Sequence, residues 1–255
     1  MLYHYTTIDV LALILKNKTL RFNCLINVDD QNEADTIDHG SFKKNIFVSC
    51  WTHDKNENIA LWNMYAKNMQ GIRIGIDSKN IIFKPKEKTL VPLYYLVDNV
   101  IPEVENAGFI IWYQNKGQFD NKISVLYDLE EKYKFEIKKN EILTHYNFED
   151  LVCRKRKEWE FQQEIRFVLF GASKEEDNIY FNHQYIINNI VNRKEFSCNF
   201  VDLVLYDDFF NDIEILLGPN TTNSDKIICE SLLDYFIGNN KYKLLNSKLN
   251  IKLRK

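Results

Sequence analysis

The first 23 residues form a pattern that fixes how the chain begins to fold. Residues 3–6 are aromatic and β-branched, as in a pleated strand with one buried side. Apolar residues then recur at helical spacing over residues 8–18: Ile8, Leu11, Ile14 and Leu15. Thr6 or Thr7 can cap this helix, and residues 19–23 predict a second strand. His4 therefore lies in a rigid first strand, near a helix N-terminus.

The length allows one large domain or two small ones. Because no repeat or low-complexity tract marks a boundary, we expect a single globular domain over residues 1–255. Of the 255 residues, 45% are hydrophobic and 27% are charged, which suits a chain with a full core. The net charge of −3 argues against general electrostatic binding to nucleic acid or membranes. No apolar run approaches the roughly 18–20 residues that a membrane span needs. The five scattered cysteines lack a C-x-x-C pair, so we expect reduced thiols in a cytoplasmic protein without a signal peptide.

Strand and helix patterns alternate irregularly along the rest of the chain. We expect strands at 46–51, 72–77, 89–97, 109–113, 165–170, 201–206, 213–217, 242–245 and 249–253. We expect helices at 56–68, 124–145 and 223–237, the last capped by Asn223 or Ser224 and closed by Gly238. The high aromatic content of 14% favours a strand-rich α+β fold with a deep core.

An acidic cluster, Asp29, Asp30 and Glu33, follows the first helical unit. Clustered carboxylates can bind a hard cation, but an aspartate followed by glutamate three or four residues on is also an ordinary helix N-terminal box. We favour capping, and predict no metal site.

Two further motifs allow both a structural and a functional interpretation. Trp62 and Tyr65 are three residues apart, so they share a helix face that serves as core or as a stacking surface for a planar heterocycle. The basic run 154–157 can meet phosphate groups or form a solvated turn.

Directly after this run, Gln162 and Glu164 stand two apart at the mouth of a strand, so they share a face. Arg166 follows on that face and can pair with Glu164.

Taken together, these motifs resemble an uncharacterised bacterial family of unknown function. The resemblance is carried by His4-Tyr5-Thr6, Asp30-x-x-Glu33, Trp62-x-x-Tyr65, Gly71, Trp159-x-x-Gln162-x-Glu164-x-Arg166 and the segment 215–218. It spans nearly the whole chain, including the closing strand near residue 249. Asp29 replaces an expected Asn, and Gln162 replaces the usual Glu. The family is in turn distantly similar to ADP-ribosyltransferases.

That second resemblance implies a fold and a reaction. The fold would be a mixed, mostly antiparallel split sheet with flanking helices, holding NAD as the substrate in a cleft. Glu164, His4 and Gln162 would be catalytic, with His4 on the ribose and Glu164 stabilising the positive charge that develops on the sugar. Residues that would contact NAD are His4, Tyr5, Thr6, Tyr65, Trp62, Ser49 and Arg166. On this interpretation, His4 and Glu164 face each other across a pocket.

Two functions of different classes follow from the resemblance. The first is an NAD-consuming ADP-ribosyltransferase or NAD glycohydrolase, acting as a bacterial toxin or antiphage effector on a nucleic acid or protein acceptor. The second is a non-catalytic nucleotide-sensing or partner-binding module on the same fold. A metal-dependent nuclease ranks last, because its only local candidate ligands are the acidic cluster. The chain lacks a G-x-S-x-G elbow, a P-loop and a G-x-G-x-x-G fingerprint.

Overall fold

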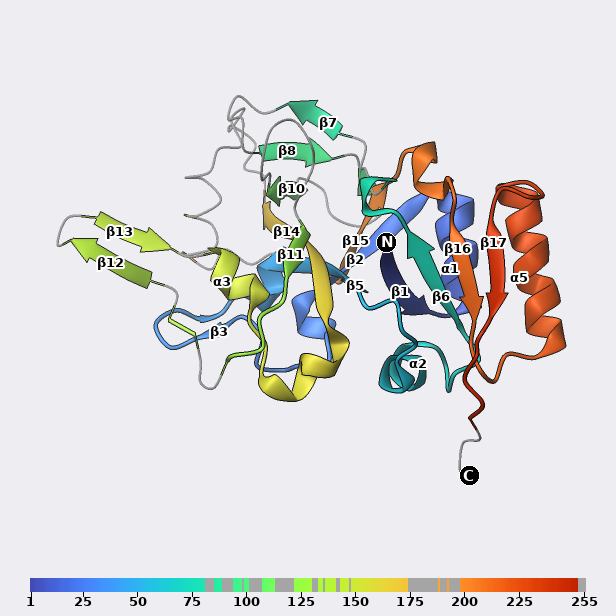
Figure 1. Cartoon of the computed structure of the whole chain (residues 1–255). Coiled ribbons are helices and arrows are strands. Elements are labelled where there is room, and N and C mark those ends of the chain that lie inside the picture. The colour runs from blue at the N-terminus through green and yellow to red at the C-terminus, as the bar shows by residue number, and fades with distance from the viewer. Residues whose placement is uncertain are drawn as a thin grey trace.

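The computed structural model describes most of the chain (Figure 1). The described residues are 1–80, 85–88, 94–97, 99–100, 107–112, 122–129, 133–134, 136–140, 143–146, 148–173, 188, 192 and 198–251. Together they form a mostly antiparallel sheet with a few helices, which confirms the expected α+β class.

Strands outnumber helices in this part of the chain. The α-helices are α1 (Ile8–Asn17), α2 (Ile59–Tyr65), α3 (Phe148–Cys153) and α5 (Asn223–Phe236). The 3-10 helices are η1 (Leu25–Asn27), η2 (Lys43–Asn45), η3 (Ser78–Asn80), η4 (Lys157–Gln162) and η5 (Asp207–Phe210). The first strands are β1 (Leu2–Thr6), β2 (Thr19–Cys24), β3 (Asp35–Thr36), β4 (Gly40–Ser41), β5 (Ile46–Thr52), β6 (Ile72–Ile76), β7 (Pro85–Lys88), β8 (Tyr94–Val97), β9 (Asn99–Val100) and β10 (Ala107–Trp112). The later strands are β11 (Lys122–Ser124), β12 (Glu136–Asn140), β13 (Leu143–Tyr146), β14 (Glu164–Ser173), β15 (Phe200–Val204), β16 (Glu214–Leu217) and β17 (Lys243–Asn246).

The opening strand–helix–strand unit has the predicted form. Thr7 caps α1 by accepting a hydrogen bond from the Val10 N–H at 3.3 Å. Lys18 ends the helix in the left-handed conformation, with φ of 52°. The buried residues of α1, namely Leu11, Ile14 and Leu15, are three of the four that defined its apolar face.

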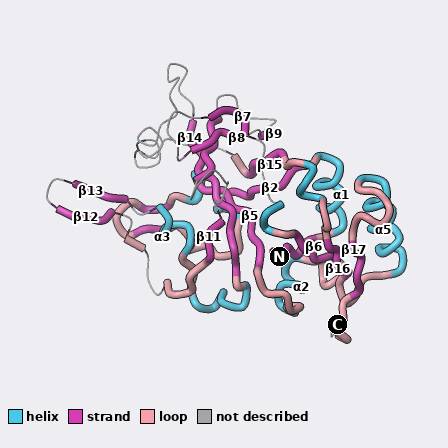
Figure 2. Tube along the Cα trace, turned by 45° about the horizontal axis from the view of Figure 1, so that its top comes forward, coloured by secondary structure: helices cyan, strands magenta, loops and turns pink. Residues whose placement is uncertain are grey.

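Strand β5 is shared by two arms of the main sheet. One edge pairs with β14 along its whole length, from Ile46 to Thr52. The other edge pairs with β1 at Thr52 and with β2 at Phe47 and Val48. One arm continues through β1, β6, β16 and β17, and the other through β14, β10, β8 and β7. In Figure 2 the two arms lie on either side of β5, and β12–β13 projects away from both.

The two faces of the sheet have different cores. The larger core lies on the face that carries α1 and α5, and it includes Trp51, Ile165 and Phe167. The smaller core lies on the face that carries α2, and it includes Tyr5, Trp62 and neighbouring apolar residues. Because strand side chains alternate, residues 164 and 166 point to the α2 face while 165 and 167 point to the other.

Several element boundaries differ from the sequence predictions. The expected helix at 124–145 is wrong, because β12 and β13 pair there as an antiparallel hairpin. Mixed charges suit a solvated strand as well as a solvated helix, and Ile137, Thr144 and Tyr146 favour the strand. The expected strand at 249–253 is absent through residue 251, and residues 252–255 lie outside the described part, as do 89–93 and 113. Thr222, rather than Asn223 or Ser224, caps α5 through a capping box with Asp225.

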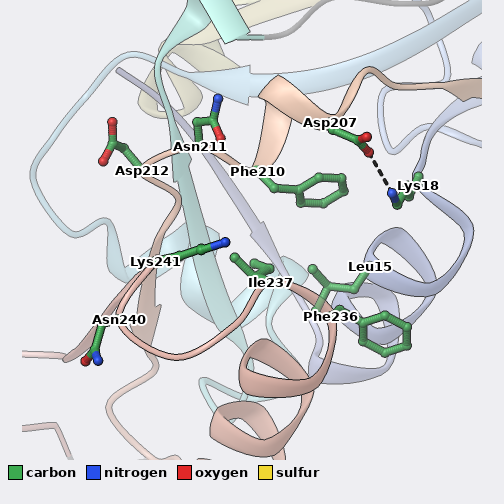
Figure 3. Close-up of a pocket in the computed structure, with 10 residues that line it drawn as sticks. All are labelled: Leu15, Lys18, Asp207, Phe210, Asn211, Asp212, Phe236, Ile237, Asn240 and Lys241. Atoms are coloured by element: carbon green, nitrogen blue, oxygen red, sulfur yellow. Dashed lines mark hydrogen bonds and ion pairs between the residues drawn. The ribbon is translucent and has the colours of Figure 1, made fainter.

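A cavity of about 580 Å³ opens beside the C-terminal ends of α1 and α5 (Figure 3).

Among the described residues, no helix is long and apolar enough to cross a membrane.

Gly71 lies where two backbone segments meet, and its replacement tests this packing. A Cβ at position 71 would lie 2.2 Å from the Thr6 carbonyl oxygen and 2.9 Å from the Ala66 Cβ. We therefore expect Gly71→Ala to lower the free energy of unfolding by about 3 kcal/mol, because backbone has to move. Urea denaturation measures this loss. Gly75→Ala is the control, since its Cβ would meet side-chain atoms, namely the Tyr3 ring at 3.1 Å and the Glu214 Cβ at 3.4 Å. An equal loss in both variants would contradict the argument.

Candidate functional site

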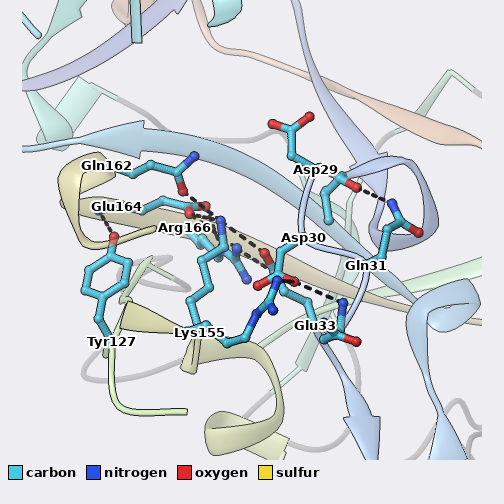
Figure 4. A network of polar contacts seen from close by, with 12 residues as sticks. Asp29, Asp30, Gln31, Glu33, Tyr127, Lys155, Gln162, Glu164 and Arg166 are labelled. Atoms are coloured by element: carbon cyan, nitrogen blue, oxygen red, sulfur yellow. Dashed lines mark hydrogen bonds and ion pairs between the residues drawn. The ribbon is translucent and has the colours of Figure 1, made fainter. Parts of the chain in front are cut away.

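Four charged side chains form a buried ion network at the start of β14 (Figure 4). The Lys155 ammonium lies 2.7 Å from Glu164 Oε2 and 3.0 Å from Glu33 Oε1. Arg166 donates to Glu164 Oε1 at 2.6 Å, and its Nη2 lies 2.6 Å from Glu33 Oε2. All four residues are at least 95% buried, so two acids and two bases balance within the protein.

Local backbone geometry aims Glu164 and Lys155 at each other. Helix η4 ends at Gln162, and Gln163 adopts the left-handed conformation with φ of 41° before β14 begins. The Glu164 N–H donates to the Tyr127 hydroxyl at 2.7 Å. Lys155 lies between α3 and η4, where its N–H donates to the Leu126 carbonyl at 2.9 Å. The Lys155 ammonium also donates to the Gln162 side-chain oxygen at 2.8 Å.

The acidic cluster has a different role from the predicted helix cap. Residues 31–34 form a turn and no helix follows, so the capping interpretation is wrong. Glu33 instead joins the ion network. Asp30 accepts from the Asn32 N–H at 3.0 Å and lies 3.2 Å from the Arg156 guanidinium. The second carboxylate oxygen of Asp30 is buried and has no hydrogen-bond partner among the described residues.

Tyr65 connects the ion network to the surface. Its hydroxyl accepts from the Gln162 amide at 2.8 Å and donates to Asp29 at 2.7 Å. Tyr65 is half-buried and Asp29 is exposed, so this chain of hydrogen bonds leads from the buried network to solvent. Burial and the Asp29 carboxylate raise the pKa of Tyr65 well above its usual value, so the hydroxyl keeps its proton. Trp62 belongs to the smaller core, and its ring N–H donates to Glu57 at 3.1 Å.

The network keeps Glu164 ionised despite its burial. Burial alone would raise the pKa of Glu164, but Arg166 and Lys155 together lower it to about 2. Burial alone would likewise lower the pKa of Arg166, but Glu164 and Glu33 raise it well above its usual value. The half-buried Cys50 thiol hydrogen-bonds to Glu164. Burial and the Glu164 carboxylate raise the pKa of Cys50 well above its usual value, which favours the neutral thiol over the thiolate.

His4 points away from this network. Tyr3 pairs with Thr52, and Thr52 pairs with Glu164, so Tyr3 and Glu164 share one face of the sheet and His4 points to the other. The His4 ring lies 5.1 Å from the Trp51 ring, on the larger-core face, and its Nδ1 donates to the Cys50 carbonyl at 2.8 Å. Burial lowers the pKa of His4, although this hydrogen bond opposes the shift. The expected arrangement, with His4 and Glu164 facing one pocket, is therefore absent.

The remaining predicted contacts divide between the two faces. Ser49 is buried on the His4 side and accepts from the Trp51 ring N–H at 3.1 Å. Thr6 is buried in β1, and Tyr5 packs edge-on against Trp62 at 4.8 Å. The residues that the structure does bring together are Glu164, Gln162, Tyr65 and Arg166. The described residues contain no group of three His, Cys, Asp or Glu side chains placed to hold a metal ion.

Two members of the network were not predicted as site residues. Lys155 belongs to the basic run, whose sequence spacing gave no sign of a partner. Glu33 was assigned to a cap because Asp29 and Asp30 precede it. Their pairing joins positions more than a hundred residues apart, which no local pattern encodes.

Residues 61–167 match a family model described as Protein of unknown function (DUF2971). The matched segment contains Tyr65, Lys155, Gln162, Glu164 and Arg166, and it leaves out His4 and Glu33. The expected likeness to an uncharacterised family is thus confirmed for this segment, and the likeness to ADP-ribosyltransferases stays a prediction. No curated protein and no solved structure matches the chain.

Replacing Glu164 tests the balance of charge in the network. Glu164→Gln leaves Lys155 and Arg166 with Glu33 as their remaining described carboxylate. Breaking a buried pair in this way costs about 3–5 kcal/mol, so we expect a loss of that size in the free energy of unfolding at pH 7. Glu158→Gln, at an exposed position in η4, is the control and should change stability by less than about 0.5 kcal/mol.

The loss of stability in Glu164→Gln should depend on pH. Because the pKa of Glu164 is about 2 when folded and 4.5 when unperturbed, its charge stabilises the fold above pH 4.5. This contribution disappears as the pH falls through about 2. The stability difference between wild type and Glu164→Gln should therefore shrink over that range, as measured by urea unfolding at each pH. A difference that stays constant would show that Glu164 is not held as a carboxylate.

Proposed function

We propose that this chain is a non-catalytic, nucleotide-sensing module in which Glu164 is a structural carboxylate. The observation that carries the proposal is the pairing of both Glu164 oxygens with cations, at 2.6–3.2 Å from Arg166 and 2.7 Å from Lys155. A carboxylate neutralised in this way has little remaining field to stabilise a positively charged sugar. Its burial within the network also leaves no free oxygen for a substrate.

The rim of the network suggests which part of a nucleotide would bind. Asp29 is exposed, and its carboxylate accepts hydrogen bonds but repels phosphate oxygens. The half-buried Tyr65 beside it would supply an aromatic ring for a base to stack on. These two side chains suit a nucleoside, with Asp29 on amino or hydroxyl groups, better than they suit a polyphosphate.

An NAD-consuming transferase or glycohydrolase is the second candidate, and one observation favours it. Tyr65, Gln162 and Glu164 are joined through Lys155 by hydrogen bonds of 2.7–2.8 Å, and the resemblance to ADP-ribosyltransferases assigns a role to each of these three. Catalysis would require Lys155 and Arg166 to move away from Glu164. It would also require another residue in the ribose-binding role of His4.

Measurement of nicotinamide release separates these two functions. We expect purified wild-type protein to release no nicotinamide from NAD, with or without RNA, DNA or protein acceptors, because Glu164 is fully paired. Chromatography of the reaction mixture detects release. Turnover that is lost in Glu164→Gln and retained in Glu158→Gln would overturn the non-catalytic proposal and establish the second candidate.

Binding at the rim needs its own test. We expect adenosine and NAD to raise the melting temperature saturably, since both carry a base and ribose hydroxyls. Asp29→Ala should weaken binding about 5-fold, the effect of an exposed hydrogen-bonded charge worth about 1 kcal/mol. Glu160→Ala is the matched control, an exposed carboxylate in η4. Absence of any nucleoside-dependent shift would contradict nucleotide sensing and would leave a protein partner as the ligand.

A further inference from the structure

The cavity beside α1 and α5 is separate from the Glu164 network. It lies at the face of the sheet that carries those helices, and none of its lining residues belongs to the network. Its volume of about 580 Å³ falls within the range of roughly 300–1,000 Å³ that is usual for small-molecule sites.

The cavity has apolar walls and a polar rim. Leu15, Phe210, Phe236 and Ile237 supply the apolar surface. Three of the polar lining residues have positive φ, namely Lys18 (52°), Asp212 (55°) and Asn240 (66°). These residues end α1, follow η5 and lie in the turn after α5, so tight backbone turns set the shape of the rim.

Charges at the rim are unevenly paired. The Lys18 ammonium already lies 2.6 Å from Asp207. Lys241 differs, because no carboxylate among the described residues lies within ion-pair distance of its ammonium. In Figure 3 the Lys241 side chain points toward Ile237, below Phe210, and all three residues line the cavity.

The geometry points to this cavity as a binding site for a small carboxylic acid with a flat apolar body. The Lys241 ammonium would pair with the carboxylate, and the Phe210 ring would pack against the apolar body. An acid of this kind supplies the negative charge that Lys241 lacks. It also covers apolar surface that would otherwise face water.

A purely structural role for Lys241 predicts the opposite ligand preference. The last turn of α5 contains no basic residue, and Lys241 follows it closely, so its charge can offset the partial negative charge of the helix end. If that were its whole role, the cavity would favour an added amine over an added acid, because two helix C-termini and two aspartates surround it. The sign of the preferred ligand therefore decides between the two roles.

A matched pair of probes tests the proposal on the full chain. We expect 3-phenylpropionate to bind. The control, 3-phenylpropylamine, has the same ring and a three-carbon chain that ends in CH2–NH3+ instead of the carboxylate, and it should bind at least 5-fold more weakly, as measured by ligand-observed NMR. Lys241→Met should weaken the acid about 5-fold, the effect of an exposed ion pair worth about 1 kcal/mol. Lys243→Met, on the adjacent strand β17 and outside the cavity, should leave binding unchanged.

Protein-observed NMR locates the bound acid. Its addition should shift the backbone signals of Asn211 and Asn240, which lie on different walls of the cavity. The proposal is overturned by preferential binding of the amine, by no binding of either probe, by equal affinity in Lys241→Met, or by shifts confined to other residues. Both lysines are exposed, so neither substitution removes a buried contact.

Discussion

The shared strand β5 is the constraint on which the rest of the structure depends. It pairs with β14 along one edge, and with β1 and β2 at different points along the other. Because side chains alternate along each strand, this register determines which residues can meet. Glu164 and Arg166 are placed on the α2 face, while Ile165 and Phe167 enter the larger core. A slip of one residue between β5 and β14 would bury the two charges among Ile, Leu and Phe side chains, at a cost far above the stability of a typical domain.

The ion network therefore contributes more to fixing the strand register than to the stability of the fold. Two carboxylates and two cations removed from water lose hydration energy, which their mutual attraction offsets only when the geometry is good. Here, contacts of 2.6–3.0 Å join β14, the turn at residue 33 and the segment after α3. Well-packed apolar residues could hold these segments with similar stability. They would not fix the register as strictly, because an apolar contact tolerates displacement that a paired charge does not.

Local sequence patterns predicted helices and strands well where the spacing of apolar residues and the capping residues indicate the same element. Thr7, the apolar stripe of α1 and the alternation in β6 each have a cause within a few residues, so the sequence indicated them directly. The prediction of a helix where the hairpin β12–β13 lies was wrong, because mixed charges do not distinguish a solvated helix from a solvated strand. At the site, the pairing of Glu164 with Arg166 followed from their spacing of two. The contacts of Lys155 with Glu33 and of Gln162 with Tyr65 required the tertiary fold, since both join distant segments.

The position of His4 shows why motif resemblance and geometry have to be combined. A histidine in the first strand and a glutamate at the start of β14 match the expected residue types, and both strands flank β5. Pairing through β5 nevertheless directs their side chains to opposite faces. His4 then contacts Trp51 in the larger core, where burial favours the neutral ring, whereas Glu164 stays charged among cations. Chemistry at Glu164 would therefore have to draw its other groups from the α2 face, where Tyr65, Gln162 and Cys50 lie. A ligand that reaches that carboxylate has to displace Lys155 or Arg166 from it.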